Sequence, residues 1–135
     1  MNHICLIGET DPFVASLLQR FAETSGLQAV RVQVGQDLPE LAQQLSPDVI
    51  ILEAELPGKL RGWEAALALK ANAATAHIPI ISCSWLPKDE ASALIGDAAA
   101  YLQKPELHYE DFVAALSAAG VGAEIDQDGG LSDRK

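Results

Sequence analysis

Residues 47–58 read Pro-Asp-Val-Ile-Ile-Leu-Glu-Ala-Glu-Leu-Pro-Gly, and this stretch indicates the fold. Four apolar residues follow one another at 49–52 without alternation, which is typical of a strand buried on both faces of a sheet. The run stops on the carboxylate of Glu53, and Pro57-Gly58 marks a turn shortly afterwards. A carboxylate at the end of a buried strand lies where α/β proteins place their functional sites.

The same pattern extends in both directions along the chain. Short apolar runs alternate with segments of helical periodicity, which predicts an α/β domain with helices on both faces of a parallel sheet. We expect a flavodoxin-like, doubly wound sheet of five strands in the order 2-1-3-4-5, forming one domain over residues 1–119. Residues 120–135 are rich in Gly, Asp and Gln, and we expect a flexible acidic tail. The predicted strands are residues 4–7, 27–34, 49–52, 80–84 and 99–102, and the predicted helices cover residues 12–25, 38–45, 62–69, 88–95 and 109–119.

Composition excludes several classes of protein. A formal net charge of −10 and the lack of a basic stripe argue against nucleic-acid binding. No run of about eighteen apolar residues is present, which argues against a membrane span, and we expect a cytoplasmic protein.

Cys5 and Cys83 lie in separate apolar strands with another strand between them, too far apart for a disulfide, and are expected to be buried thiols.

Polar residues gather where the predicted strands end. With the expected strand order, the crevice at the switch point lies between strands one and three. It would receive Glu9, Thr10 and Asp11 after the first strand and Glu53 after the third. Ser84 and Lys104 follow the fourth and fifth strands.

Six short motifs, in order and at nearly regular spacing, resemble one family. The chain is similar to the receiver domain of bacterial two-component response regulators, a phosphorelay signalling module, over about residues 3 to 119. The motifs are Gly8-Glu9-Thr10-Asp11-Pro12, residues 47–53, Leu56-Pro57-Gly58, Gly62-Trp63-Glu64, His77-Ile78-Pro79-Ile80-Ile81 and Ala100-Tyr101-Leu102-Gln103-Lys104-Pro105.

The resemblance implies a role for each site residue. In the family, an acidic pair and an acceptor aspartate hold magnesium, while a hydroxyl and a lysine contact the phosphoryl group. By position, Glu53 stands at the acceptor place, Glu9 and Thr10 at the acidic pair, and Ser84 and Lys104 at the phosphoryl contacts. Tyr101 stands at the place of the aromatic residue that moves as the domain switches. The resemblance also implies a cis bond before Pro105.

Two departures affect the same chemistry. Thr10 offers a neutral hydroxyl where magnesium would find a charge. Glu53 extends its carboxylate by one methylene, on the order of 1.5 Å, which misplaces it for in-line attack. We therefore predict no phosphorylation by the family mechanism and no resident metal; Mg²⁺ would be a cofactor only of a working receiver, with Glu9, Asp11 and Glu53 as weak candidate ligands.

A salt bridge is the expected replacement for the metal. Glu53 and Lys104 have opposite charges at the same edge of the sheet, and such a pair favours both ionised forms. This arrangement is compatible with a locked, partly active-like state and with a frozen inactive state. A one-residue slip of the first loop would bring Asp11 into the acidic pair instead, although Pro12 would then stand one place too early.

The sequence thus predicts an atypical receiver domain that is not an enzyme and acts through protein–protein contacts. Alternatives are a working phosphoacceptor with weak divalent-metal binding, and a small-molecule-binding flavodoxin-like domain. A histidine kinase or an effector protein would be the partner, and a homodimer through the face of the fourth helix, fifth strand and fifth helix is also predicted. The residues expected on that face are Leu94, Tyr101, Val113 and Leu116, with Trp85 and Leu86 at its rim.

Overall fold

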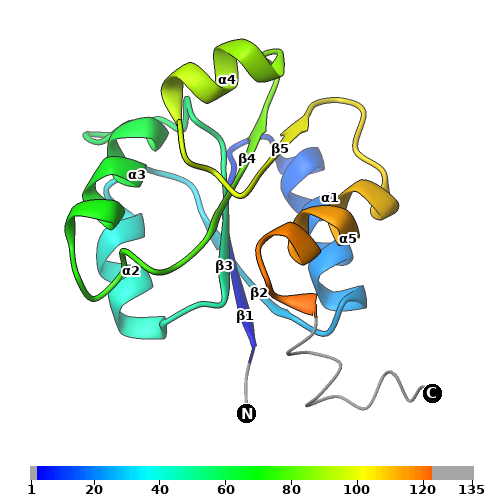
Figure 1. Cartoon of the computed structure of the whole chain (residues 1–135), viewed down its shortest axis with the longest axis horizontal. Helices are drawn as coiled ribbons and strands as arrows, with labels where there is room; N and C mark the ends of the chain where they lie inside the picture. The colour runs from blue at the N-terminus through cyan, green and yellow to red at the C-terminus, as the bar shows by residue number, and fades with distance from the viewer. Residues whose placement is uncertain (1–2, 123–135) are drawn as a thin grey trace.

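The computed structural model describes residues 3–122, a five-stranded parallel sheet with helices on both faces (Figure 1). The strand order is β2-β1-β3-β4-β5, which confirms the predicted flavodoxin-like topology. The strands are β1 (Ile4–Gly8), β2 (Gln28–Val32), β3 (Val49–Leu52), β4 (Ile80–Ser84) and β5 (Ala100–Gln103). The helices are α1 (Pro12–Thr24), α2 (Asp37–Leu45), α3 (Gly62–Ala71), α4 (Lys88–Leu94) and α5 (Tyr109–Ala118).

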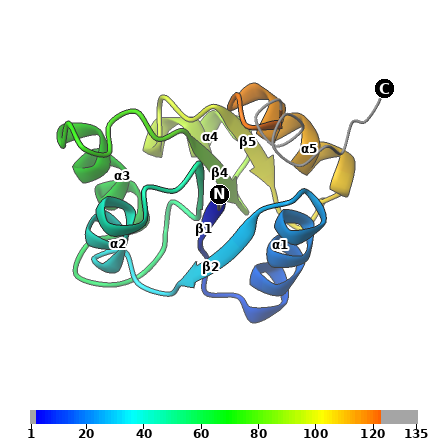
Figure 2. The same ribbon diagram turned by 90° about the horizontal axis from the view of Figure 1, so that it is seen from below.

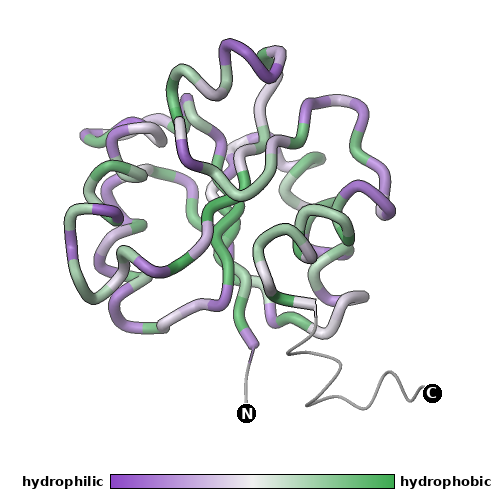
Figure 3. The backbone as a smooth tube through the Cα atoms, in the orientation of Figure 1, coloured by the Kyte–Doolittle hydropathy of each residue, from purple (hydrophilic) through white to green (hydrophobic). Residues whose placement is uncertain are grey.

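Two layers of helices enclose the sheet. Helices α1 and α5 lie on one side, and α2 and α3 lie on the other with α4 beside them (Figures 1 and 2). Successive residues of each central strand point to opposite sides, so each layer has its own apolar core. Ile51 belongs to the core under α1 and α5, while Ile50 and Leu52 belong to the core under α2 and α3. This explains the unbroken hydrophobic run at 49–52, which Figure 3 shows as part of the apolar centre of the molecule.

Local signals in the sequence set most element ends. Pro12 begins α1, and Asp11 caps this helix. Gly26 follows the helix with a φ of 90°, a conformation that glycine adopts without strain. Strand β2 is shorter than predicted, because Val34 already belongs to the turn that precedes α2 and accepts a hydrogen bond from Asp37 N at 3.2 Å.

The end of the described chain belongs partly to the core. Val121 is 2% exposed and packs into the core under α1 and α5. The predicted flexible tail at 120–135 otherwise lies outside the described residues, which stop at 122.

The two cysteines are free and buried, as predicted. Strand β3 separates β1, which carries Cys5, from β4, which carries Cys83. Burial raises the pKa of each thiol from 9.0 to about 12, with Asp48 adding to the effect at Cys5. At Cys83, the nearby Lys104 lowers the pKa in part, and Glu9 and Glu53 raise it.

Gly62, the first residue of α3, lies very close to the backbone that follows β3. A Cβ atom there would lie 2.0 Å from the carbonyl oxygen of Glu53 and 2.9 Å from the carbonyl carbon of Ala54. Both are backbone atoms, so the helix itself must shift. Gly62→Ala is expected to lower the free energy of unfolding by about 1–3 kcal/mol, measured by urea denaturation.

The matched control for this prediction is Gly96→Ala. Its added Cβ would meet only Ser92 O at 3.6 Å, an ordinary contact, so the change should be close to neutral. Equal stability of the two variants would contradict the close approach of α3 to Glu53.

Candidate functional site

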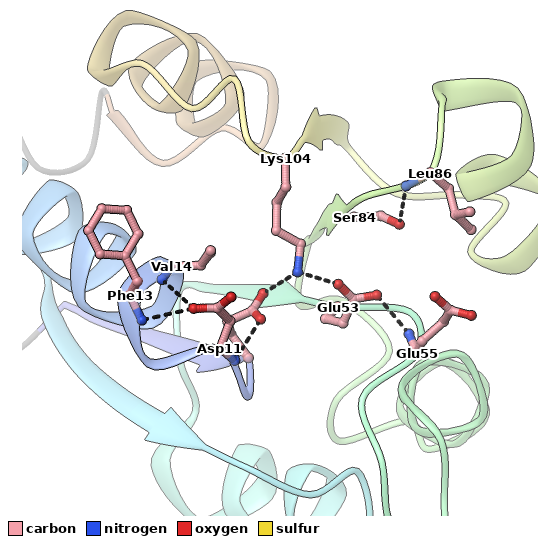
Figure 4. A network of polar contacts seen from close by, with 9 residues as sticks. Asp11, Phe13, Val14, Glu53, Glu55, Ser84, Leu86 and Lys104 are labelled. Atoms are coloured by element: carbon pink, nitrogen blue, oxygen red, sulfur yellow. Dashed lines mark hydrogen bonds and ion pairs between the residues drawn. The ribbon is translucent and has the colours of Figure 1, made fainter.

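Three charged side chains meet at the carboxyl edge of the sheet. Glu9 follows β1, Glu53 follows β3 and Lys104 follows β5. Parallel strands end at the same edge, so residues as far apart as positions 9 and 104 come together there (Figure 4). The structure thus brings together three residues that the sequence analysis expected at one edge of the sheet.

Lys104 bridges the two carboxylates. Its Nζ donates a hydrogen bond to Glu9 Oε1 at 2.9 Å and lies 2.5 Å from Glu53 Oε1. The second contact is a close ion pair. All three residues are buried, with exposed fractions of 3% for Lys104, 4% for Glu9 and 6% for Glu53. The predicted Glu53–Lys104 contact is therefore present, and Glu9 shares the same ammonium group.

Backbone donors hold the remaining carboxylate oxygens. Asp11 N donates to Glu9 Oε2 at 3.0 Å, and Glu55 N donates to Glu53 Oε2 at 3.0 Å. Each carboxylate is thus fixed on one side by its own loop and on the other by Lys104. Figure 4 shows this chain of contacts running from Asp11 to Glu55.

The pKa of Lys104 reflects two opposing effects. Burial alone lowers it, because an ammonium group is less stable out of water. Hydrogen bonding to Glu53 and Glu9 and the charges of these two carboxylates outweigh burial, and the pKa lies above its usual 10.5. Lys104 is therefore a fixed positive charge at neutral pH.

Asp11 caps a helix and does not pair with Glu9. Its Oδ1 accepts hydrogen bonds from Phe13 N at 2.9 Å and Val14 N at 3.3 Å, which satisfies two donors at the start of α1. Thr10, at the second acidic place, is exposed. In the structure the Asp11 carboxylate is used as a helix cap, although Asp11 also lines the site.

Ser84 and Trp85 complete the site in different ways. Ser84 is fully buried, and its Oγ accepts a hydrogen bond from Leu86 N at 3.0 Å. The next residue, Trp85, is 52% exposed, and its ring centroid lies 5.1 Å from Lys104 Nζ. A lysine at this distance from an indole ring makes a cation–π contact. The sequence analysis expected Trp85 at the rim of the pairing face and did not predict its contact with Lys104.

Tyr101 is held away from these charges. Its hydroxyl donates to the carbonyl oxygen of Ile95 at 2.7 Å, and Lys88 Nζ lies 5.7 Å from its ring centroid. The side chain is half-buried beside α4. The expected cis bond between Lys104 and Pro105 is present.

A cleft of about 400 Å³ opens over this site. Lys59 and Arg61, in the loop before α3, do not line it and are exposed. Glu55 is a lining residue that the sequence reading did not single out, although it stands only two residues after Glu53. The lining residues are Glu9, Thr10, Asp11, Glu53, Glu55, Trp85 and Lys104.

The side chains present are a poor match for magnesium. This ion needs several oxygen ligands in octahedral geometry. Here one oxygen of each carboxylate accepts a backbone hydrogen bond, and the other lies beside the Lys104 ammonium, which would repel a divalent cation. Within residues 3–122, no group of three or more His, Cys, Asp or Glu side chains is arranged to hold a metal.

Comparison with known proteins identifies the class. Residues 5–117 match the family described as the response regulator receiver domain. The chain therefore belongs to this family, whose members are signalling modules of two-component systems. A curated relative is the polar-differentiation response regulator DivK of Brucella ovis, which is 29% identical over 107 residues, covering 78% of this chain and 86% of DivK.

Solved receiver structures share the fold. A putative response regulator from Chloroflexus aurantiacus superposes with a TM-score of 0.79 at 22% identity, covering 89% of this chain and 99% of its own. The receiver domain of the sensor histidine kinase PA1611 from Pseudomonas aeruginosa has a TM-score of 0.75 at 22% identity, with the same coverages. That protein was solved with a magnesium ion in its active-site cleft.

The surface residues predicted for pairing are only partly exposed. Val113 is 42% exposed and Leu94 is half-buried. Leu116, by contrast, is 3% exposed and packs in the core under α1 and α5, so its assignment to the interaction face was wrong. The two residues are three positions apart on α5, an offset of about 60° around the helix axis, so Leu116 faces the sheet while Val113 lies at the border of that face with solvent. No helix within residues 3–122 has both the length and the apolarity needed to cross a membrane.

Proposed function

We propose that the chain is an atypical receiver domain that works in the cytoplasm through protein–protein contacts, without enzymatic activity and without accepting a phosphoryl group itself. The observation that carries the proposal is the placement of Lys104 between Glu9 and Glu53. In a phosphorylated receiver, the corresponding lysine contacts the phosphoryl group. Here its charge is already matched by two buried carboxylates.

Two residue types support the same conclusion. Thr10 brings no charge to a metal, and the longer Glu53 side chain is paired with Lys104. Trp85 also lies at the lysine, where an incoming phosphodonor would approach. Partner proteins would be a histidine kinase, an effector or a second copy of the chain, which would dock on surfaces outside this closed site.

A phosphodonor is expected to leave the protein unmodified. Intact-mass measurement after incubation with acetyl phosphate and magnesium should show no added phosphoryl group, because Glu53 is one methylene longer than an aspartate and Thr10 offers a metal no charge. A phosphoryl group mapped to Glu9, Asp11 or Glu53 would contradict the proposal and favour the working receiver.

A double variant of this protein is the control for the phosphorylation experiment. Combining Thr10→Asp with Glu53→Asp restores the charge and the side-chain length that the family uses at both positions. If acetyl phosphate phosphorylates this variant but not the native protein, the loss of phosphorylation is due to Thr10 and Glu53. Tryptophan fluorescence during a magnesium titration gives a second readout, since Trp85 contacts Lys104, and the native protein should show no saturable change.

A further inference from the structure

A groove of about 330 Å³ runs along the free edge of the sheet, between β5 and α5, which lie side by side in Figure 2. Strand β5 is the last in the sheet order and has only β4 as a neighbour. Its residues 100–103 line the groove, together with Ala114 and Ala115 of α5. Successive strand residues point to opposite faces, so a groove that touches all four of them follows the edge of the strand. An extended segment of chain fits such an edge.

Two carboxylates lie at one end of this groove. Glu106 follows β5, Asp111 lies in the first turn of α5, and both are exposed and line the groove. Glu106 Oε1 lies 3.7 Å from His108 Nε2. Within residues 3–122, no hydrogen bond or ion pair engages Glu106 Oε2 or the Asp111 carboxylate, and no lysine or arginine of this part of the chain lines the groove. The groove therefore suits an extended segment in which an apolar residue is followed by cations.

The sequence after α5 contains such a segment. Among residues 123–135, the cations Arg134 and Lys135 come three and four positions after Leu131. An extended chain covers about 10 Å from Leu131 to Arg134, and β5 covers the same length from its first residue to its fourth. The apolar and cationic groups of this segment thus have the spacing of the apolar and acidic parts of the groove.

The start of the segment is fixed close to the groove. Val121 is 2% exposed and packs in the core under α1 and α5. Along α5, the rise from Asp111 to Ala118 is about 10 Å, whereas the nine residues from Ala123 to Leu131 can extend over about 30 Å. The direction also fits, because a segment that enters from the end of α5 meets the two carboxylates last.

We propose that residues 131–135 dock in the groove along β5, with Leu131 in its apolar part and Arg134 and Lys135 paired with Glu106 and Asp111. This inference goes beyond the proposed function, because it gives the chain a device that controls access to its own surface. The docked segment covers the edge of β5 beside Tyr101. A partner protein or a second copy that uses this edge must first displace it.

The test uses the full chain with Ser132→Cys carrying a nitroxide spin label. Cys5 and Cys83 are buried, so the introduced thiol is the one that reacts. The backbone amide resonances of residues 100–103 should broaden, and this broadening should weaken as salt rises. Those of residues 40–44 in α2, on the other side of the sheet, should remain sharp. In a mixture of isotope-labelled protein without nitroxide and unlabelled protein with it, residues 100–103 should also remain sharp, because the contact lies within one chain.

Variants locate the contact. Glu106→Gln and Asp111→Asn should each lower the ratio of docked to free segment about 2- to 5-fold, as expected for an exposed ion pair. Leu131→Ser should lower it at least as much, because the apolar burial is lost. Glu110→Gln is the matched control. Like Asp111, Glu110 is an exposed carboxylate in the first turn of α5, but it does not line the groove, so its replacement should change little.

Four outcomes would overturn the inference. They are no broadening confined to the groove, equal effects of Glu110→Gln and Asp111→Asn, broadening in the mixed sample, and broadening of residues 16–20 instead. The last would place the acid-rich residues 124–128 on Arg20 and Arg31, which line a separate hollow beside α1. The acetyl phosphate experiment judges the proposed function separately, since it does not involve this groove.

Discussion

Replacing Lys104 by methionine is expected to lower the free energy of unfolding by about 3–5 kcal/mol at pH 7, because removing one partner of a buried ion pair leaves the other charge uncompensated. Here two carboxylates, Glu9 and Glu53, would be left buried side by side. Methionine keeps most of the side-chain length, so the loss is chiefly electrostatic. Urea denaturation of the variant and the native protein measures the difference.

The loss should depend on pH in a defined direction. Without the ammonium, the buried carboxylates would hold their protons more tightly in the folded variant than in the unfolded chain. Stability is then retained at low pH, near the ordinary carboxyl pKa of about 4, and is lost as the pH rises toward neutral. The variant should therefore approach the native protein most closely near pH 4.

Two further variants test the cause. Glu53→Gln should be milder than Lys104→Met, because Lys104 keeps its hydrogen bond to Glu9. Adding Glu53→Gln to Lys104→Met should recover part of the loss, since one of the two repelling charges is gone. A Lys104→Met protein within about 1 kcal/mol of native at pH 7 would show that the triad contributes as little as an exposed salt bridge.

The second large effect is a loss of stability in alkali caused by the two buried thiols. Cys5 and Cys83 have pKa values of about 12 in the folded protein, against 9.0 for an ordinary thiol. The unfolded chain therefore releases these protons first, and stability falls as the pH rises from 9 to 12. Each thiol would cost about 4 kcal/mol by the end of this window, from about 1.4 kcal/mol per pH unit.

Denaturation curves at pH 8, 9, 10 and 11 check this expectation. The native protein should lose on the order of 5 kcal/mol between pH 9 and pH 11 from the two thiols. The variant with Cys5→Ala and Cys83→Ala should have a much flatter profile there, whatever its stability at pH 8. Lys104 remains in this variant, and its raised pKa causes a further loss of stability above 10.5 in both proteins. If the stability of the native protein and that of the variant fall equally with pH, the two thiols ionise without unfolding the protein, which would contradict this expectation.

Local sequence signals were sufficient to predict most of the architecture. The apolar runs at 49–52 and 80–84 indicated buried parallel strands, and Pro12 and Gly26 marked the ends of α1. Side-chain orientation was less predictable. Leu116 and Val113 both looked like surface residues of one helix, but only the packing of α5 on the sheet determined that Leu116 turns inward.

For the site, the residue types were predictable and their pairing was only partly so. The Glu53–Lys104 contact followed from opposite charges at one edge of the sheet. The sequence did not indicate that Glu9 would share the same ammonium, because this depends on a contact between residues 95 positions apart. The cation–π contact between Trp85 and Lys104 was missed for the same reason. The cap formed by Asp11 and the acceptor role of Ser84 are local contacts that the sequence analysis did not predict.

The sequence by itself determined the order of elements, the buried strands and the replacement of two acidic-site residues by Thr10 and Glu53, because these follow from hydrophobic periodicity and residue identity. The tertiary structure determined which charges neutralise one another and which remain open to solvent. Parallel strands bring Glu9, Glu53 and Lys104 to one edge, where burial makes their pairing obligatory. Asp11 and Glu55 also line the cleft, where Glu55 is exposed and Asp11 is half-buried.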